Sequence, residues 1–428
     1  MPNRLIPPKT SMVDQLPFQI PEKVLLKNQV PVYSLNGSPE DIVRIELVFM
    51  AGSYNQNKPL VAYTMANLLN AGTSGKSSRQ IAELFDFYGV SLQIETQKDT
   101  ILVSATVLTK HLGQVLALLG EMLSDPVFPE EEVAVFTKNQ RSQHLVNTRR
   151  VEYLARTHFN EKIFGSGHPY GYRLSSGDFA KVTPSDLKEF YQSWIHPGNL
   201  FVIVSGNPPS NTMGLLEEHF NNKNWLKAGF DPGPCEYPGP ETLPAKLFIN
   251  RKGSLQSAVR IGKRTITRKH PDYHRLVITN ALLGGYFGSR LMKNIRQDKG
   301  FSYGIHSTLV SLARDGYFFV GTQVGAEVCK SALEQIYFEL YHLRTRPASK
   351  EELANMKNHL AGQYMRLFDG PFAKAERLRE LLIFGLDNLH HANFLTELKN
   401  TTSVMIMETA EKYLHEKSMT EVVVGNKQ

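Results

Sequence analysis

Hydrophobic and polar positions alternate with two different periods along this chain, and the first of them predicts strands. Residues 43–49 place hydrophobic side chains at the odd positions, with Arg44 and Glu46 between them. This period of two is the pattern of a half-buried strand. The pattern recurs at 90–94 and 101–108, so we predict strands at all three places.

The second period predicts helices. Hydrophobic side chains follow the helical spacing i, i+3, i+4 and i+7 at Ile81, Leu84, Phe85 and Tyr88. Ser77, just before this run, is a suitable N-cap. Residues 183–186 (Thr-Pro-Ser-Asp) open another helix, with proline at its first position and an acid in its first turn. Together the elements predict an α+β fold, with one largely antiparallel sheet per lobe and helices on one face.

An internal duplication organises the chain. Three stretches of the first half recur in the same order in the second half, and repeats of this kind indicate duplicated domains. The paired positions are Leu68–Leu69 with Leu282–Leu283, Lys138 with Lys357, and Gly206 with Gly425. We therefore predict two copies of one domain.

The boundary between the copies is marked by proline. Residues 227–244 hold five prolines, which disfavour a helix and favour an extended, fairly stiff connector. We expect a first domain at 1–226, a linker at 227–244 and a second domain at 245–428. Two lobes joined in this way would enclose a cleft or chamber.

Composition narrows the class of protein. Of 428 residues, 41% are hydrophobic and 21% charged, as in ordinary globular proteins, which excludes disorder, collagen and coiled coil. No apolar run approaches the ~18 residues of a membrane helix, and the first ten residues lack the apolar stretch of a signal peptide. We expect a soluble protein of the cytoplasm, with the periplasm left open.

Charge and cysteine content limit the partners and cofactors. The net charge of +7 is spread along the chain without a basic block, so neither nucleic acid nor a membrane is an expected partner. Cys235 and Cys329 are too few for a zinc-cysteine cluster or a disulfide framework.

Several motifs resemble one family. They are Ala51-Gly52-Ser53, Gly72-Thr73, the stretch 168–207 (HPYGYRLSSGDF…IVSGN) and the stretch 282–305 (LLGGYFGSRLMKNIRQDKGFSYGI). Together they resemble the M16 peptidases, the family of pitrilysin, insulin-degrading enzyme and the mitochondrial processing peptidase. The resemblance covers nearly the whole chain and implies two homologous α/β-roll domains of the LuxS/MPP-like metallohydrolase fold.

The chain departs from that family at the metal site. Where the inverted zinc motif HxxEH belongs, Tyr63, Ala66 and Asn67 stand in place of its two histidines and its glutamate. The third ligand of the family, a glutamate, falls near Gln143–His144, where no carboxylate exists. Zinc hydrolysis needs three protein ligands and a base that activates water. We therefore expect this chain to bind no zinc and to hydrolyse nothing by itself.

Other histidines offer no substitute site. The pair His270 and His274 is expected to be exposed on a turn that enters a helix. The adjacent His390 and His391 are expected to point different ways on one helix without partner acids, and His158 to lie on a solvated helix face.

The second lobe keeps a different pair. The resemblance implies that Arg296 and Tyr303, seven residues apart, hold the substrate backbone and donate hydrogen bonds to the oxyanion, acting from the half opposite the zinc. From the residues alone, Tyr303 could equally be a core residue on a strand with Phe301 and Ile305, and Arg296 a solvated helix residue. Similarly, a tight turn explains the three glycines of this region as well as contact with a passing peptide does; they are Gly284, Gly285 and Gly288.

Two functional hypotheses follow. In the first, the chain is the non-zinc subunit of a two-chain M16 peptidase. A partner chain carrying HxxEH supplies zinc and the base, and this chain supplies Arg296 and Tyr303 in trans to a peptide or unfolded polypeptide. In the second, it is a catalytically inert structural or peptide-binding protein, acting as a homodimer or as a core subunit of a larger complex.

Overall fold

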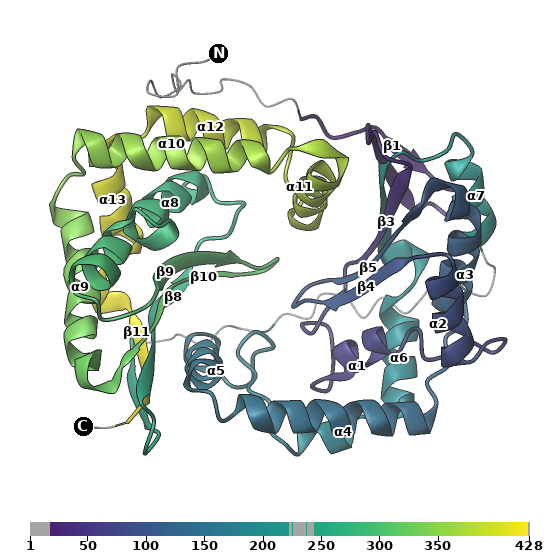
Figure 1. Ribbon diagram of the computed structural model, residues 1–428, viewed down its shortest axis with the longest axis horizontal. Helices are drawn as coiled ribbons and strands as arrows, with labels where there is room; N and C mark the ends of the chain where they lie inside the picture. The colour runs from purple at the N-terminus through teal and green to yellow at the C-terminus, as the bar shows by residue number, and fades with distance from the viewer. Residues whose placement is uncertain (1–17, 222–224, 226–236, 238–243, 427–428) are drawn as a thin grey trace, which may run out of the picture.

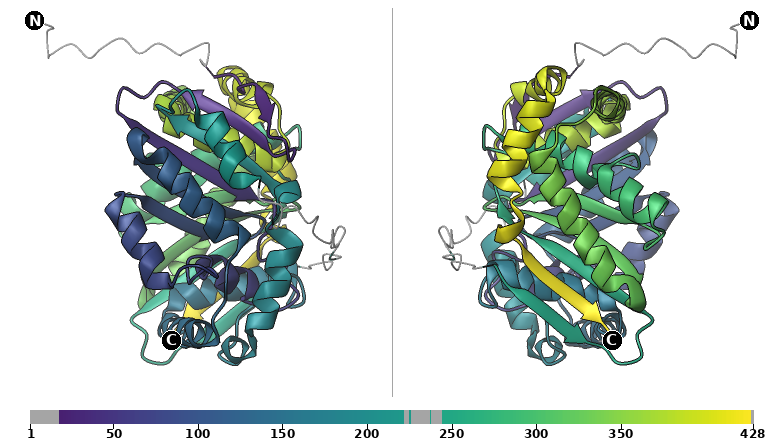
Figure 2. Two further views of the ribbon diagram at one scale, coloured as in Figure 1. Left: turned by 90° about the vertical axis from the view of Figure 1, so that its right-hand side faces the viewer. Right: turned by 90° about the vertical axis from the view of Figure 1, so that its left-hand side faces the viewer.

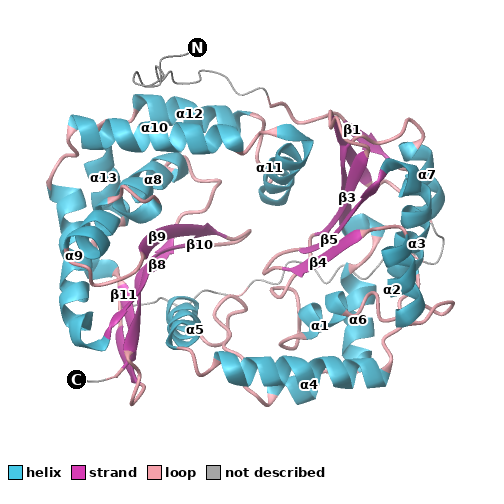
Figure 3. Ribbon diagram, in the orientation of Figure 1, coloured by secondary structure: helices cyan, strands magenta, loops and turns pink. Residues whose placement is uncertain are grey.

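The computed structural model describes residues 18–221, 225, 237 and 244–426, which form two lobes side by side (Figure 1). The N-terminal lobe holds a six-stranded sheet and the C-terminal lobe a five-stranded sheet. In each lobe most of the helices lie on the outer side of the sheet (Figure 3). The linker expected at 227–244 lies outside the described residues except for Tyr237 and Pro244.

The two sheets share one topology. The first has the order β1-β2-β6-β3-β5-β4 and the second β7-β11-β8-β10-β9, so the second repeats the first once β1 is set aside. Each has one parallel pair, β2 with β6 and β7 with β11, and is otherwise antiparallel. The strands are β1 (Lys23–Leu25), β2 (Pro31–Asn36), β3 (Ile42–Phe49), β4 (Ser91–Thr96), β5 (Ile101–Leu108), β6 (Leu200–Gly206), β7 (Lys246–Asn250), β8 (Gln256–Thr265), β9 (Ile305–Ser311), β10 (Gly316–Gly325) and β11 (Thr420–Gly425).

The helices follow the same duplicated order. In the first half they are α1 (Val61–Asn67), α2 (Ser78–Phe87), α3 (Leu112–Ser124), α4 (Glu130–Asn147), α5 (Val151–Phe164), α6 (Pro184–Trp194) and α7 (Thr212–Phe220). In the second half they are α8 (Tyr273–Asn280), the π-helical segments η4 (Ala281–Gly285) and η5 (Met292–Asp298), α9 (Cys329–Thr345), α10 (Lys350–Arg366), α11 (Gly370–Phe384), α12 (Leu389–Asn400) and α13 (Ser403–Tyr413).

The elements predicted from periodicity are confirmed. The three strands are β3, β4 and β5. Helix α2 begins after Ser77, whose hydroxyl caps the Gln80 amide while the Gln80 side chain caps Ser77 in return. Helix α6 has the same reciprocal cap between Thr183 and Asp186, with Pro184 at its first position.

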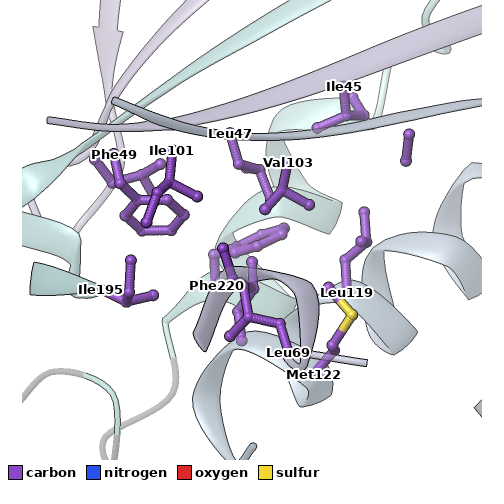
Figure 4. Packing of buried hydrophobic residues seen from close by; sticks show 14 of the residues in the cluster. Ile45, Leu47, Phe49, Leu69, Ile101, Val103, Leu119, Met122, Ile195 and Phe220 are labelled. Carbon is purple, nitrogen blue, oxygen red and sulfur yellow. The ribbon is translucent and has the colours of Figure 1, made fainter. Parts of the chain in front are cut away.

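The outer face of each sheet is covered by helices from the same half of the chain (Figure 2). In the N-terminal lobe, hydrophobic side chains of β3 and β5 point down onto side chains from the helical layer (Figure 4). Those labelled are Ile45, Leu47, Phe49, Ile101 and Val103 from the sheet, and Leu69, Leu119, Met122, Ile195 and Phe220 from the segments beneath it. This layer is the larger apolar core of the lobe.

The inner face of each sheet is covered by a helix from the other half. Helix α5, of the first half, packs on β8 and β11 of the second sheet, and α11, of the second half, packs on β2 and β6 of the first. Phe159 of α5 joins Val422 and Val424 of β11 in one buried cluster. Leu378 of α11 joins Ile203 of β6 in another. We call this arrangement the helix exchange; it adds a second covered face to the one predicted from sequence.

An ion pair accompanies the apolar contact of α11. Glu46 of β3 is buried, and its carboxylate accepts a hydrogen bond of 2.6 Å from the Arg379 guanidinium. Burial raises the pKa of Glu46, and the attraction of Arg379 opposes that shift.

Within the described part of the chain, every helix is too short or too polar to cross a membrane.

Candidate functional site

The three positions of the degenerate zinc motif lie on helix α1 and are used for packing. Ala66 is fully buried in the core. The ring of Tyr63 packs against Phe136 of α4, with centroids 5.9 Å apart. The Asn67 amide donates a 2.8 Å hydrogen bond to the Tyr63 carbonyl oxygen, which ties the side chain back to its own helix. These residues hold the helix in place but offer no metal ligand set.

The position of the third ligand is equally changed. Gln143 is exposed on α4, and its amide lies 3.3 Å from the Asn147 side chain. His144 is buried, with its Nδ1 3.2 Å from the Tyr153 hydroxyl and its ring against Phe179. Burial lowers the pKa of His144, and the negative charge of Asp178 opposes that shift. The side chain at this position that most resembles a metal ligand is therefore the neutral imidazole of His144.

These residues do not fit a zinc ion. Hydrolytic zinc is held by three nitrogen or oxygen ligands and works with a base. Within residues 18–221, 225, 237 and 244–426, no three histidine, cysteine or acidic side chains are grouped so that they could hold a metal. These residues must therefore have a role other than zinc binding.

A pocket of about 430 Å³ occupies this place, and we call it the motif pocket. Tyr63 of α1, Gln140 and His144 of α4, and Lys98 from the β4–β5 turn all line it. The loop that follows α5 closes one side with Pro169 and neighbouring residues. Its size lies within the roughly 300–1,000 Å³ range of small-ligand sites.

The pair predicted in the second lobe is brought together. The Arg296 guanidinium carbon lies 5.1 Å from the centre of the Tyr303 ring and 4.9 Å from that of Phe287. These are cation–π distances. Tyr303 is 92% exposed, so the interpretation of it as a core residue is wrong. Phe287, also exposed, completes an aromatic clamp on the guanidinium that sequence reasoning missed.

Tyr303 lies in the turn before β9, whereas the sequence placed it on the strand. Gly300, two residues after the end of η5, has a φ of 65°, a left-handed conformation that favours glycine. The buried Ser302 hydroxyl oxygen lies 2.7 Å from the carbonyl oxygen of Gln323 and 2.8 Å from that of Gly304, and its single O–H donates between them. It also accepts from the Thr322 hydroxyl. Ser302 thus fixes the base of the turn, and Tyr303 projects from it.

Beside this turn lies a second pocket, of about 290 Å³, that both halves of the chain build. Tyr303, His306 and the buried Arg260 line it from the second half, and Glu152 of α5 lines it from the first. The Gln323 amide donates a 2.9 Å hydrogen bond to the Glu152 carboxylate. The helix exchange is what brings Glu152 here.

The three glycines differ in their surroundings. A Cβ on Gly284 would lie 2.6 Å from the Ser307 hydroxyl oxygen and 2.7 Å from the Ser307 nitrogen, so this buried glycine lets η4 pack closely on β9. Gly285 and Gly288 are exposed. Contact with a peptide stays a prediction for these glycines.

The expectation that His274 is exposed is wrong, and the pair on α12 has surroundings that the sequence did not indicate. His274 is not exposed: its ring packs on that of His390, with centroids 4.5 Å apart. His390 and His391 are both buried, and the Tyr364 hydroxyl lies 2.6 Å from His391 Nδ1. Burial, reinforced by neighbouring histidines and arginines, lowers the pKa of His390 to about 3 and that of His391 to about 4. Helix α12 packs on α8 and α10, so both of its histidines meet protein.

Comparison with other proteins places this geometry in a family. The profile described as insulinase (peptidase family M16) matches residues 32–166, and that described as peptidase M16 inactive domain matches residues 181–360. Among curated relatives, the uncharacterized zinc protease YmxG of Bacillus subtilis is 24% identical, over 74% of this chain and 76% of its own. The non-peptidase homolog YmxG of Helicobacter pylori is 22% identical, over 90% and 89%.

Solved structures agree on the fold. An M16 inactive domain from Pseudomonas fluorescens aligns with a TM-score of 0.86 and 22% identity, covering 95% of this chain and 98% of that one. A protease from Helicobacter pylori aligns with a TM-score of 0.87 and 18% identity, covering 95% and 100%. Together the two profiles cover most of the chain, which belongs to the peptidase M16 family.

Proposed function

We propose that this chain is the non-zinc-binding subunit of a two-chain M16 peptidase and that it supplies Arg296 and Tyr303 to a peptide bound at the metal site of a partner chain carrying HxxEH. The observation that carries the proposal is the exposure of Tyr303. A phenol that is 92% exposed and pinned at its base by Ser302 contributes little to the core of its own lobe.

The chemistry of the pair suits this role. A phenol offers one directed hydrogen-bond donor on a rigid ring, and a guanidinium offers a permanent charge with a fork of donors. Both can stabilise negative charge that develops on the carbonyl oxygen of a scissile peptide. Removing one such donor typically lowers kcat by about 10²–10³. The partner would contribute the metal ligands and the base that α1 lacks.

A second function has one observation in its favour. A relative that matches 90% of this chain is named a non-peptidase homolog, and that description fits a structural or peptide-binding protein. In that case the chain would act as a homodimer or inside a larger assembly, and the exposed pair would have no catalytic effect.

Reconstitution of the two-chain complex distinguishes between the two proposed functions. The purified chain should leave a quenched fluorescent peptide intact with zinc added, and mixing it with its HxxEH partner should produce cleavage. Tyr303→Phe and Arg296→Ala should then lower kcat by about 10²–10³. Tyr341→Phe is the matched control, because Tyr341 is also an exposed tyrosine beside an arginine, Arg344. Cleavage that both substitutions leave unchanged would favour the inert protein.

A further inference from the structure

The motif pocket contains an unbalanced positive charge. Lys98 is the one residue of its lining that carries a formal charge, and no aspartate or glutamate lines it. Lys98 is half-buried, and burial lowers its pKa, while the negative charge of Asp99 opposes that shift. Buried lysines are rare unless they are paired, because the charge loses its hydration. A half-buried lysine that forms no ion pair with the described residues, and that lines a pocket, therefore favours the binding of an anion.

Most of the hydrogen-bonding capacity of this lysine is unused. An ammonium group has three N–H donors, and the Lys98 Nζ uses one in a 3.2 Å hydrogen bond to the Pro169 carbonyl oxygen. Across the described ranges of the chain, no carboxylate lies within ion-pair distance of it. Two donors are thus left for a ligand.

The nearest acid is committed elsewhere. Asp99 follows Lys98 in sequence, but its Oδ1 accepts a hydrogen bond from the Tyr170 hydroxyl and its Oδ2 one of 2.9 Å from the Ala313 amide. Its carboxylate also lies 3.6 Å from the Arg314 guanidinium. The direct partners of Asp99 are therefore other residues, two of them from the second half, and its charge acts on Lys98 without an ion pair or hydrogen bond between them.

The rest of the lining defines what else the ligand carries. Five side-chain amides line the same pocket, and each has both a donor and an acceptor, as a peptide group does. They are Gln56, Gln97, Gln140, Gln143 and Asn147. Leu60, Leu174 and Phe179 add apolar walls. The adjoining strand β4 is an edge of its sheet, so an extended chain can lie beside it.

From this arrangement we propose that the motif pocket binds a carboxylate group of a peptide, with Lys98 as the charge that recognises it. The carboxylate is either the C-terminal group of the peptide or an aspartate or glutamate side chain. Loss of the zinc motif has then left a recognition site in place of a metal site. The inference concerns the isolated chain and does not depend on a catalytic partner.

Three fluorescein-labelled peptides test the proposal by fluorescence polarisation with the full chain alone. One ends in Ala-Ala-Phe-Leu with a free carboxylate, the second is its C-terminal amide, and the third is that amide with glutamate in place of one alanine. A charge-assisted hydrogen bond predicts that at least one of the two peptides carrying a carboxylate binds about 10–100-fold more tightly than the neutral amide. The one that binds more tightly identifies the source of the carboxylate.

Two variants locate the binding. Lys98→Met should reduce the affinity of the preferred peptide to that of the neutral one, and Gln143→Trp, at an exposed position on the rim, should block the pocket without disturbing the fold. Lys263→Met is the matched control, because Lys263 is another lysine whose pKa is lowered by burial, and it donates to the Ser418 hydroxyl.

Several results would overturn the proposal. They are equal affinity for all three peptides, preferential binding that survives Lys98→Met, and a loss of binding in Lys263→Met as large as that in Lys98→Met. Failure of the partner to restore peptidase activity would leave these measurements as they are, so the two proposals fail separately.

Discussion

The buried histidines of α12 make a quantitative prediction about stability and pH. His390 and His391 are held neutral in the folded chain, with pKa values lowered to about 3 and about 4 by burial and by neighbouring positive groups, among them Arg268 and Arg377. In the unfolded chain the pKa of a histidine is about 6.5. The unfolded state therefore binds more protons below pH 6.5, and stability falls as the pH falls from 6.5 towards the folded-state values.

The size of the effect follows from the difference in pKa. One pKa unit corresponds to about 1.36 kcal/mol, so each histidine lowers the free energy of unfolding by about 2 kcal/mol between pH 7.5 and pH 5. Together His390 and His391 account for about 4 kcal/mol. For a protein with a typical stability of about 5–15 kcal/mol, that is a large share.

Urea unfolding at pH 7.5 and at pH 5, followed by circular dichroism, measures this loss in the free energy of unfolding. The double substitution His390→Gln/His391→Gln should make the loss between pH 7.5 and pH 5 about 4 kcal/mol smaller than in the native chain. Comparing losses cancels any change that the substitutions cause at both pH values. His359→Gln is the control, since His359 is exposed on α10. Equal losses in the native chain and the double variant would refute the reasoning.

Four more substitutions test the packing and the turn before β9. Arg379→Ala removes the hydrogen-bonded partner of the buried Glu46 carboxylate and leaves it only Arg44, 4.0 Å away, so it should cost about 1–3 kcal/mol in urea unfolding. An unchanged free energy of unfolding would show that the hydrogen bond from Arg379 is dispensable. Gly284→Ala should cost about 1–3 kcal/mol by overpacking, whereas Gly362→Ala, in open space on α10, should stabilise by about 0.5–1 kcal/mol. Ser302→Ala should speed amide exchange at the turn that carries Tyr303, and unchanged exchange would contradict its anchoring role.

The helices and strands could be predicted from the sequence because the residues that determine each of them lie close together along the chain. Ser77 and Thr183 cap α2 and α6 through side chains three residues apart, and the hydrophobic periods of β3 and β5 lie in single short stretches. The duplication was visible for a similar reason: each copy repeats its own turns and strand ends.

Tertiary placement was not predictable in the same way. The alternation of Phe301, Tyr303 and Ile305 imitates a strand, and only the hydrogen bonds of Ser302 to Gln323 show that the segment is a turn. The pair at 390–391 is buried on both sides because other helices flank α12, a fact that no spacing within α12 records. The motif pocket likewise depends on segments far apart in sequence.

The helix exchange constrains how the chain could ever be divided. A cut at the proline-rich connector would leave each fragment with a helix whose buried side chains have lost their docking surface and with a sheet whose inner apolar face is uncovered. Such fragments should cling to one another or precipitate. Each half therefore supplies a helix that completes the packing of the other half, and we expect neither half to fold stably by itself.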